Sequence, residues 1–258
     1  MKSPLDPRTQ QTGHASAQFW VGVGVRAQRV LDAAQADYGY GAPSEAHRPR
    51  LYRGPMGWWG QGDSVELVVS GDAPVDTARL CRALETRHAT GAPPAATTIR
   101  FVFLLDVAED ALGIELRRLL LSHGFTVIEC TAAADRVARA GLVGLANLKW
   151  NPGLIGVDTN DLAHAMTSPG GRSGFGRIGV ETDAQAGDIE KGSALGAFLI
   201  CLYSSIDLGE LARLVRLTES YLPRKDYLIL MTAACDPRST LLEGKKRTAC
   251  LLWASPDA

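Results

Sequence analysis

Two short segments of the sequence hold residues whose types and spacing suit chemistry. In the first, Gly22 and Gly24 follow the apolar run 19–23 and precede a helical pattern, in a G-x-G-x-x-A arrangement that ends at Ala27. Glycines in such a turn let the backbone approach a phosphate, which the helix N-terminus attracts. A dinucleotide fold also needs an acidic residue about 20 positions later, and a Gly/Pro/aromatic region stands there instead. The segment therefore predicts either a phosphate-binding turn or a plain tight turn.

The second segment, residues 152–161, follows a long helical pattern and carries Asp158 and Asp161. Two carboxylates that project from a loop into a helix start can polarise a water molecule or hold a cation. The same side chains can instead cap the helix, which stabilises it by about 1 kcal/mol without any chemistry. The residues alone favour capping.

Other catalytic and metal-binding patterns do not occur in the sequence. It has neither a G-x-x-x-x-G-K-[ST] phosphate loop nor a G-x-S-x-G nucleophile turn, and its five histidines lack evident triad partners. The five cysteines form no C-x-x-C pair and show no metal-ligand spacing with the histidines. We therefore predict reduced core thiols and no metal site.

Composition bounds the class of protein. The chain has 258 residues, 46% of them hydrophobic, which excludes overall disorder and suffices for one large or two modest domains. With 27 basic and 28 acidic residues, no global field attracts nucleic acid or anionic lipid. The longest apolar run, 194–203, is about half the ~20 residues that cross a bilayer, and no apolar leader begins the chain. We expect a soluble, cytoplasmic protein without nucleic-acid or membrane partners.

Apolar runs and helical periodicity alternate through the first 150 residues. This alternation predicts an α/β fold in which a buried parallel sheet is connected by crossover helices. The expected strands are 19–23, 65–69, 99–105 and 125–130, and the expected helices are 27–36, 75–86, 111–123 and 132–149.

Two other stretches have a different character. Residues 38–63 combine five Tyr and Trp side chains with many Gly and Pro, which predicts a long loop pinned to its own domain or, alternatively, one that binds a partner. The polar segment 167–174 is a candidate domain boundary. Beyond it, the pattern predicts strands 176–181, 195–203, 227–233 and 248–253, with helices 160–166, 183–191 and 208–221 around them.

One segment carries a specific family resemblance. Residues 134–166 read ADRVARAGLVGLANLKWNPGLIGVDTNDLAHAM, with a PGLI-x-VD-x-x-D core. This segment resembles the central helix and catalytic loop of FtsZ, the bacterial tubulin-like cell-division GTPase. Weaker similarities cover residues 19–31, 65–85, 198–203, 207–221 and 228–237.

The resemblance implies a tubulin/FtsZ-like α/β fold. A flexible tail (1–16) would precede a degenerate Rossmann-like nucleotide-binding domain (17–131). The central helix and catalytic-type loop (132–170) and a smaller βαβαββ two-layer C-terminal domain (171–258) would follow.

The resemblance also assigns a role to the two loop acids. In the family, an Asn and two Asp of this loop enter the nucleotide site of the next subunit in a head-to-tail filament and position the attacking water. The corresponding residues are Gly156, Asp158 and Asp161, so both acids remain and the amide is missing.

The nucleotide side of the resemblance is depleted. The family's glycine-rich first turn shrinks to the turn around Gly22 and Gly24, and its GGGTG[ST]G motif is missing because Gly71 leads almost directly into Ala73-Pro74-Val75. A base-contacting Asp corresponds to Asp135. Because anion binding needs many aligned N–H donors, we expect at most weak GTP or GDP binding, with Mg²⁺ only where nucleotide binds.

These features lead to one main hypothesis and three others. The main hypothesis is a pseudo-GTPase that does not form filaments and modulates or caps polymers of FtsZ or another tubulin-like protein in bacterial cell division. A divergent GTPase that self-associates head-to-tail and hydrolyses GTP is the alternative. A nicotinamide-dependent oxidoreductase built on the first glycine turn and an inactive structural relic are the others.

Overall fold

The computed structural model describes residues 18–39, 49–52, 64–89, 99–130, 134–150, 172–179, 194–203, 228–235 and 247–254, with positions 209, 212 and 216. Within these ranges, no helix is both long and apolar enough to cross a membrane.

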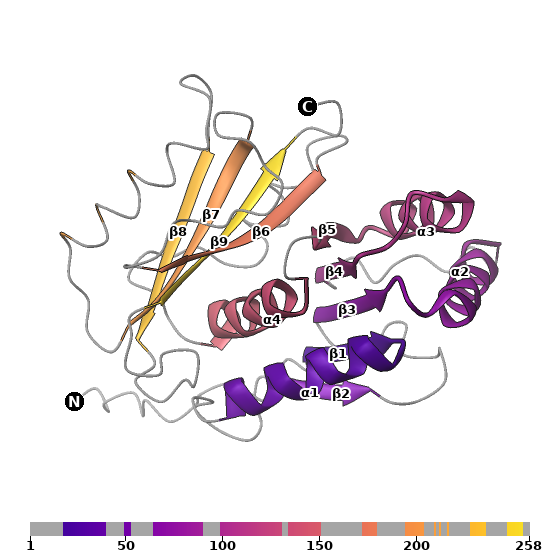
Figure 1. Cartoon of the computed structure of the whole chain (residues 1–258), viewed down its shortest axis with the longest axis horizontal. Coiled ribbons are helices and arrows are strands. Elements are labelled where there is room, and N and C mark those ends of the chain that lie inside the picture. Colours follow the sequence, from indigo (N-terminus) through magenta and orange to yellow (C-terminus); the bar gives the residue numbers. More distant parts are fainter. Residues whose placement is uncertain are drawn as a thin grey trace, which may run out of the picture.

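Five parallel strands form the part of the sheet that precedes residue 131 (Figure 1). Their spatial order is β2 (Arg50–Tyr52), β1 (Gln18–Val23), β3 (Ser64–Ser70), β4 (Ile99–Leu105) and β5 (Thr126–Cys130). The predicted parallel sheet is thus confirmed, with boundaries within two residues of those expected. The three-residue β2 lies inside the region predicted to be loop, which was wrong there because pairing with β1 rather than local composition makes the strand.

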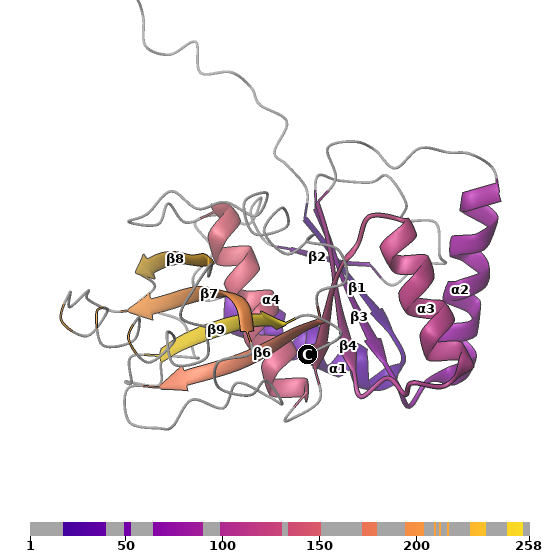
Figure 2. The same cartoon turned by 90° about the horizontal axis from the view of Figure 1, so that it is seen from above.

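Helices cover both faces of these strands (Figure 2). On one face lie α2 (Pro74–Ala89) and α3 (Ala111–Ser122), and on the other lie α1 (Val25–Gly39) and α4 (Ala134–Trp150). The described side chains of the central strands β3 and β4 are therefore buried on both faces, as their apolar runs predict. The core between the strands and the α2/α3 layer includes Val21, Val65, Leu67, Val69, Leu80, Leu84, Val102, Leu104, Leu116 and Leu120.

Four further strands continue the sheet beyond β5. Their order is β6 (Arg172–Gly179), β9 (Arg247–Ala254), β7 (Ala194–Tyr203) and β8 (Leu228–Cys235), with antiparallel pairing of β9 to both neighbours. All four expected strands are present, but β6 begins inside the segment 167–174 that was proposed as a domain boundary, and it pairs with β5 at Glu129 and Gly174. The expected helices 160–166 and 183–191 lie outside the described residues, as does most of 208–221.

The helix α4 stands between the two groups of strands. It contacts β4 and β5 on one side and β6, β8 and β9 on the other (Figure 2). Its first turn, which contains Asp135, lies beside the ends of the parallel strands. Both α4 and α1 therefore present their first turns near the same sheet edge, where the candidate site lies.

The packing of α2 makes a stability prediction. Leu80 is fully buried between α2 and the sheet, whereas Val75 on the same helix is 65% exposed. Leu80→Ala should lower the free energy of unfolding by about 2–5 kcal/mol, because it leaves a cavity in the core. Val75→Ala should change it little. Chemical denaturation of the two variants measures the difference, and equal effects would contradict the packing described.

Candidate functional site

The carboxyl ends of the parallel strands bring together four chain segments. The turn after β1 contains Gly24, the turn after β3 contains Gly71, the residue after β4 is Asp106, and α4 contributes Asp135. In open α/β sheets, ligands bind in the crevice outside this edge. We call these segments, with the first turns of α1 and α2, the carboxyl edge.

The structure places the predicted site residues unequally. Gly24, Gly71 and Asp135 lie at the carboxyl edge, and their role in nucleotide binding stays a prediction. Gly22 lies within β1 under α1, where an added Cβ would stand 3.1 Å from Leu31 Cδ1, so its contact is with the helix packed on the strand. The two loop acids, Asp158 and Asp161, lie outside the described residues and stay a prediction.

The turns of the carboxyl edge touch one another directly. Gly24 has a φ of 98°, and a Cβ added there would stand 2.6 Å from Ala73 Cβ. A Cβ on Gly71 would stand 2.1 Å from the carbonyl oxygen of Asp106. Real Cβ atoms do not approach so closely, so only glycine fits at either position. The first turn is therefore packed against the second, and the second against the third.

Backbone N–H groups of the turn after β3 are used inside the protein. The Gly71 amide donates to the carbonyl oxygen of Leu105 at 2.8 Å, and the Ala73 amide donates to that of Ser70 at 3.2 Å. The Ser70 hydroxyl donates to the Asp72 carboxylate. A phosphate cradle needs several N–H groups that point together at the anion. In this turn, those of Gly71 and Ala73 point at carbonyl groups instead, so they do not fit a bound phosphate.

A single guanidinium bridges two carboxylates across the carboxyl edge. Arg26, in the first turn of α1, lies with Nη2 2.8 Å from Asp106 Oδ2 and with Nε 2.6 Å from Asp135 Oδ1. Its side chain is 30% exposed, against 46% and 55% for the two acids. Burial opposes the charge of Arg26, but its hydrogen bonds to Asp106 and Asp135 outweigh burial and raise its pKa.

Sequence reasoning missed both Arg26 and Asp106 as site residues. A signal for Arg26 was present, because an arginine stands in the first turn where the resembling family has a run of glycines. Asp106 gave no such signal, since it follows β4 as one of several polar residues.

The backbone at Asp106 is fixed independently of this bridge. Its φ of 49° lies in the left-handed region, which Asp tolerates better than most residues, and its amide donates to the carbonyl oxygen of Cys130 at 3.1 Å. The next strand thus holds the peptide that carries the Asp106 carboxylate. Cys130 itself is buried, and burial raises the pKa of its thiol, which makes it a core residue rather than a nucleophile.

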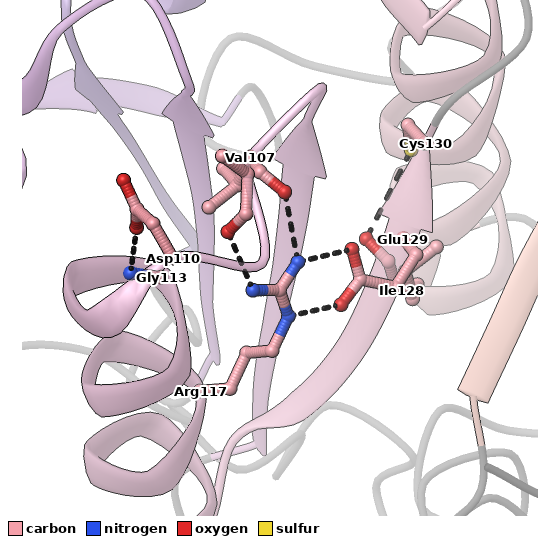
Figure 3. Close-up of polar contacts among 8 residues, drawn as sticks. Val107, Asp110, Gly113, Arg117, Ile128, Glu129 and Cys130 are labelled. Carbon is pink, nitrogen blue, oxygen red and sulfur yellow. Dashed lines mark hydrogen bonds and ion pairs between the residues drawn. The ribbon is translucent and has the colours of Figure 1, made fainter.

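A second ion pair anchors the loop between β4 and α3 (Figure 3). Arg117 of α3 meets Glu129 of β5 through two contacts, 2.7 Å from Nε and 3.2 Å from Nη2. The same guanidinium donates to the carbonyl oxygens of Val107 and Ala108, at 2.9 and 3.1 Å. Both charged side chains are about one-fifth exposed. Burial opposes the charge of Arg117, but Glu129 outweighs it and raises the pKa of Arg117.

The start of α3 completes this anchor. Asp110 is the N-cap of the helix, and its carboxylate accepts a hydrogen bond from the Gly113 amide at 2.8 Å (Figure 3). Loop 106–110 is therefore held at both ends, by β5 at Asp106 and by α3 at Asp110. Among the residues described, no group of three or more His, Cys, Asp and Glu is arranged to hold a metal ion.

With this geometry established, solved structures provide the comparison. FtsZ from M. jannaschii, in a structure titled as an empty dimer, matches with a TM-score of 0.59 over 95% of this chain and 89% of that chain, at 16% identity. CetZ from Methanosaeta thermophila matches with a TM-score of 0.56 over 94% and 87%, at 12% identity. GDP-bound CetZ1 from Haloferax volcanii gives 0.52 over 93% and 94%, at 8% identity.

This chain has the FtsZ/tubulin-like fold. The resemblance found in the sequence is thus confirmed at the level of the FtsZ/CetZ fold, over about 95% of the chain. A scan of the sequence against protein-family models finds no match, and no curated protein matches it either. At identities of 8–16%, the FtsZ-like architecture is shared while the side chains of the carboxyl edge must be argued from this chain itself.

The contacts of Arg117 can be tested by substitution, with the neighbouring Arg118 as the control. Arg117→Ala should lower the free energy of unfolding by about 2–3 kcal/mol, because it leaves Glu129 and two loop carbonyls without their donor. Arg118→Ala should have little effect, since Arg118 and its partner Glu115 pair at the exposed surface of α3. Urea denaturation measures both. Similar losses in the two variants would show that the Arg117 contacts contribute nothing special.

Proposed function

We propose that this protein is a pseudo-GTPase of the FtsZ/tubulin-like fold that caps or modulates a tubulin-like polymer without binding nucleotide. The observation that carries the proposal is the bridge from Arg26 to Asp106 and Asp135 across the carboxyl edge. GDP-bound CetZ1 shows that proteins of this fold bind a guanine nucleotide. The resemblance places the phosphates at the carboxyl ends of the parallel strands. In this chain, contacts from Arg26 to Asp106 and Asp135 bridge that region.

The charge of the carboxyl edge also argues against a bound nucleotide. Asp72, Asp106 and Asp135 bring three carboxylates to it, and Arg26 balances one of them. Two unit charges 4 Å apart near a protein surface interact by about 4 kcal/mol. A triphosphate at this edge would meet that repulsion, and it would have to displace Arg26 from its two partners. The depleted glycine turns offer little in return, because the amides of Gly71 and Ala73 are already bonded.

Capping follows from an asymmetry between two surfaces. By resemblance, Asp158 and Asp161 belong to the loop that enters the nucleotide site of the next subunit. A subunit that keeps this loop can dock on a partner that holds GTP. Without a nucleotide of its own it offers no such site to a further subunit, and a head-to-tail contact that cannot propagate ends a polymer. FtsZ from M. jannaschii, in a structure titled as an empty dimer, supports association as a property of this fold, and the assembly experiment below decides whether a nucleotide-free copy of this chain ends a polymer.

Nucleotide binding separates this proposal from the divergent-GTPase alternative. Labelled GTP and GDP should show no binding to the purified protein up to millimolar concentration, with or without Mg²⁺. Micromolar binding followed by hydrolysis would overturn the pseudo-GTPase and favour the alternative, for which GDP-bound CetZ1 is the precedent. Equilibrium dialysis with a polymerising FtsZ as the positive control makes this measurement.

Polymer assembly tests the capping step. Substoichiometric protein added to an FtsZ that polymerises with GTP should shorten the polymers and change GTP turnover, as followed by light scattering and phosphate release. The double variant Asp158→Asn, Asp161→Asn should lose the effect, because these acids are proposed to face the partner's nucleotide. Circular dichroism of the variant checks that it is folded. Unchanged assembly in the presence of the unmodified protein would contradict the proposal.

A further inference from the structure

We infer that Arg26 is a built-in counter-ion that balances one of the two facing carboxylates of the carboxyl edge without nucleotide or metal. The geometry behind this inference is one guanidinium between two carboxylates from different elements, Asp106 after β4 and Asp135 in α4. The inference deepens the proposed function, and it rests on it in one respect: no nucleotide-bound cation supplies the balancing charge.

The backbone positions of the two acids are set by contacts other than Arg26. Asp106 is fixed by its amide bond to the Cys130 carbonyl, and the loop behind it is held by Arg117. Asp135 is fixed by its place in the first turn of α4, where a negative charge is favourable. Removal of Arg26 would therefore leave two carboxylates facing a common centre. The charge at that centre would change from −1 to −2.

The backbone at the start of α1 places Arg26 beside the two acids. Arg26 stands two residues after Gly24, whose positive φ turns the chain from β1 into α1. Its side chain is more buried than either carboxylate and contacts both of them. The raised pKa of Arg26 agrees with this placement, since both partners favour its charged form.

A divalent cation is the natural replacement for a missing guanidinium at such a centre. Mg²⁺ and Ca²⁺ prefer carboxylate oxygens, and two acids from fixed elements present those oxygens together. The unmodified protein should gain little from these ions, because Arg26 already occupies the space between the pair and leaves it with a net charge of only −1. The stability of a variant without the guanidinium should depend on these ions. A ligand that binds the folded state and not the unfolded state stabilises the folded state.

Thermal unfolding of the full chain tests this inference with Mg²⁺ alone as the probe. In EDTA, Arg26→Ala should unfold about 2–6 °C below the unmodified protein, and millimolar MgCl₂ should restore at least half of that loss. The unmodified protein and Arg29→Ala, which alters an exposed arginine on the same helix, should shift little in either condition. KCl of matched ionic strength controls for screening.

Two further variants keep the test decisive. Arg26→Lys retains a positive charge and should stay insensitive to Mg²⁺, even where its geometry is poorer. Arg26→Ala with Asp135→Asn removes one of the two facing charges and should regain stability in EDTA without Mg²⁺, a coupling that a double-mutant cycle measures. A folded Arg26→Ala protein with an unchanged melting temperature in EDTA, or one that ignores Mg²⁺, would overturn the inference.

The outcome is independent of the nucleotide experiment. Micromolar GTP binding by the unmodified protein would end the proposed function, while a Mg²⁺-dependent Arg26→Ala variant would still show that Arg26 balances this edge. If GTP does not bind and the Arg26→Ala variant does not respond to Mg²⁺, the pseudo-GTPase proposal would stand. The inference that Arg26 balances the charge of the edge would then be wrong.

Discussion

Direct contact between the turns at the carboxyl ends of β1, β3 and β4 constrains everything else at this site. Neighbouring strands lie about 4.8 Å apart, so turns that leave them at the same level meet unless the chain between strand and helix is long. Here that chain is short, and Gly24 and Gly71 are the residues that let the backbones touch. A phosphate site at this edge needs turns whose N–H groups point outward at the anion, whereas here the amides of Gly71 and Ala73 bond to carbonyl groups and charged side chains meet at the edge.

The ion pairs of Arg117 and Arg26 differ in burial and in the contacts that they make. Arg117 is mostly buried, forms a two-point contact with Glu129 and also bonds two carbonyl groups, which is the geometry in which charged hydrogen bonds contribute most. Arg26 pairs with acids that are about half exposed, where each pair alone is worth little. Arg117 fixes the loop that carries Asp106. Because that loop is already in place, Arg26 can pair with Asp106 without having to order it.

The sequence predicts the framework well and the site only in part. Strand 99–105 and its neighbours follow from continuous apolar runs, because burial on both faces leaves few polar positions. By contrast, Arg26 and Asp135 are 109 residues apart in the sequence, and spacing along a chain does not show which distant side chains share a sheet edge. The same limit applies to β2, which exists through its pairing with β1. Gly22 and Gly24 looked equivalent, yet one lies under a helix and the other forms the turn.

Charge also bears on which partner the proposed docking loop would choose. In a head-to-tail contact between two copies of this chain, Asp158 and Asp161 would approach an edge that already carries Asp72, Asp106 and Asp135, with Arg26 engaged by the last two. Acid facing acid opposes such a contact, and no bound cation is proposed to relieve it. On the proposed function, a GTP-bearing partner would instead present a nucleotide at the same place. Under the proposed function, the charge of this edge thus disfavours a polymer of this chain alone and favours a partner that kept its nucleotide, because specificity arises as much from the contact that is penalised as from the one that is favoured.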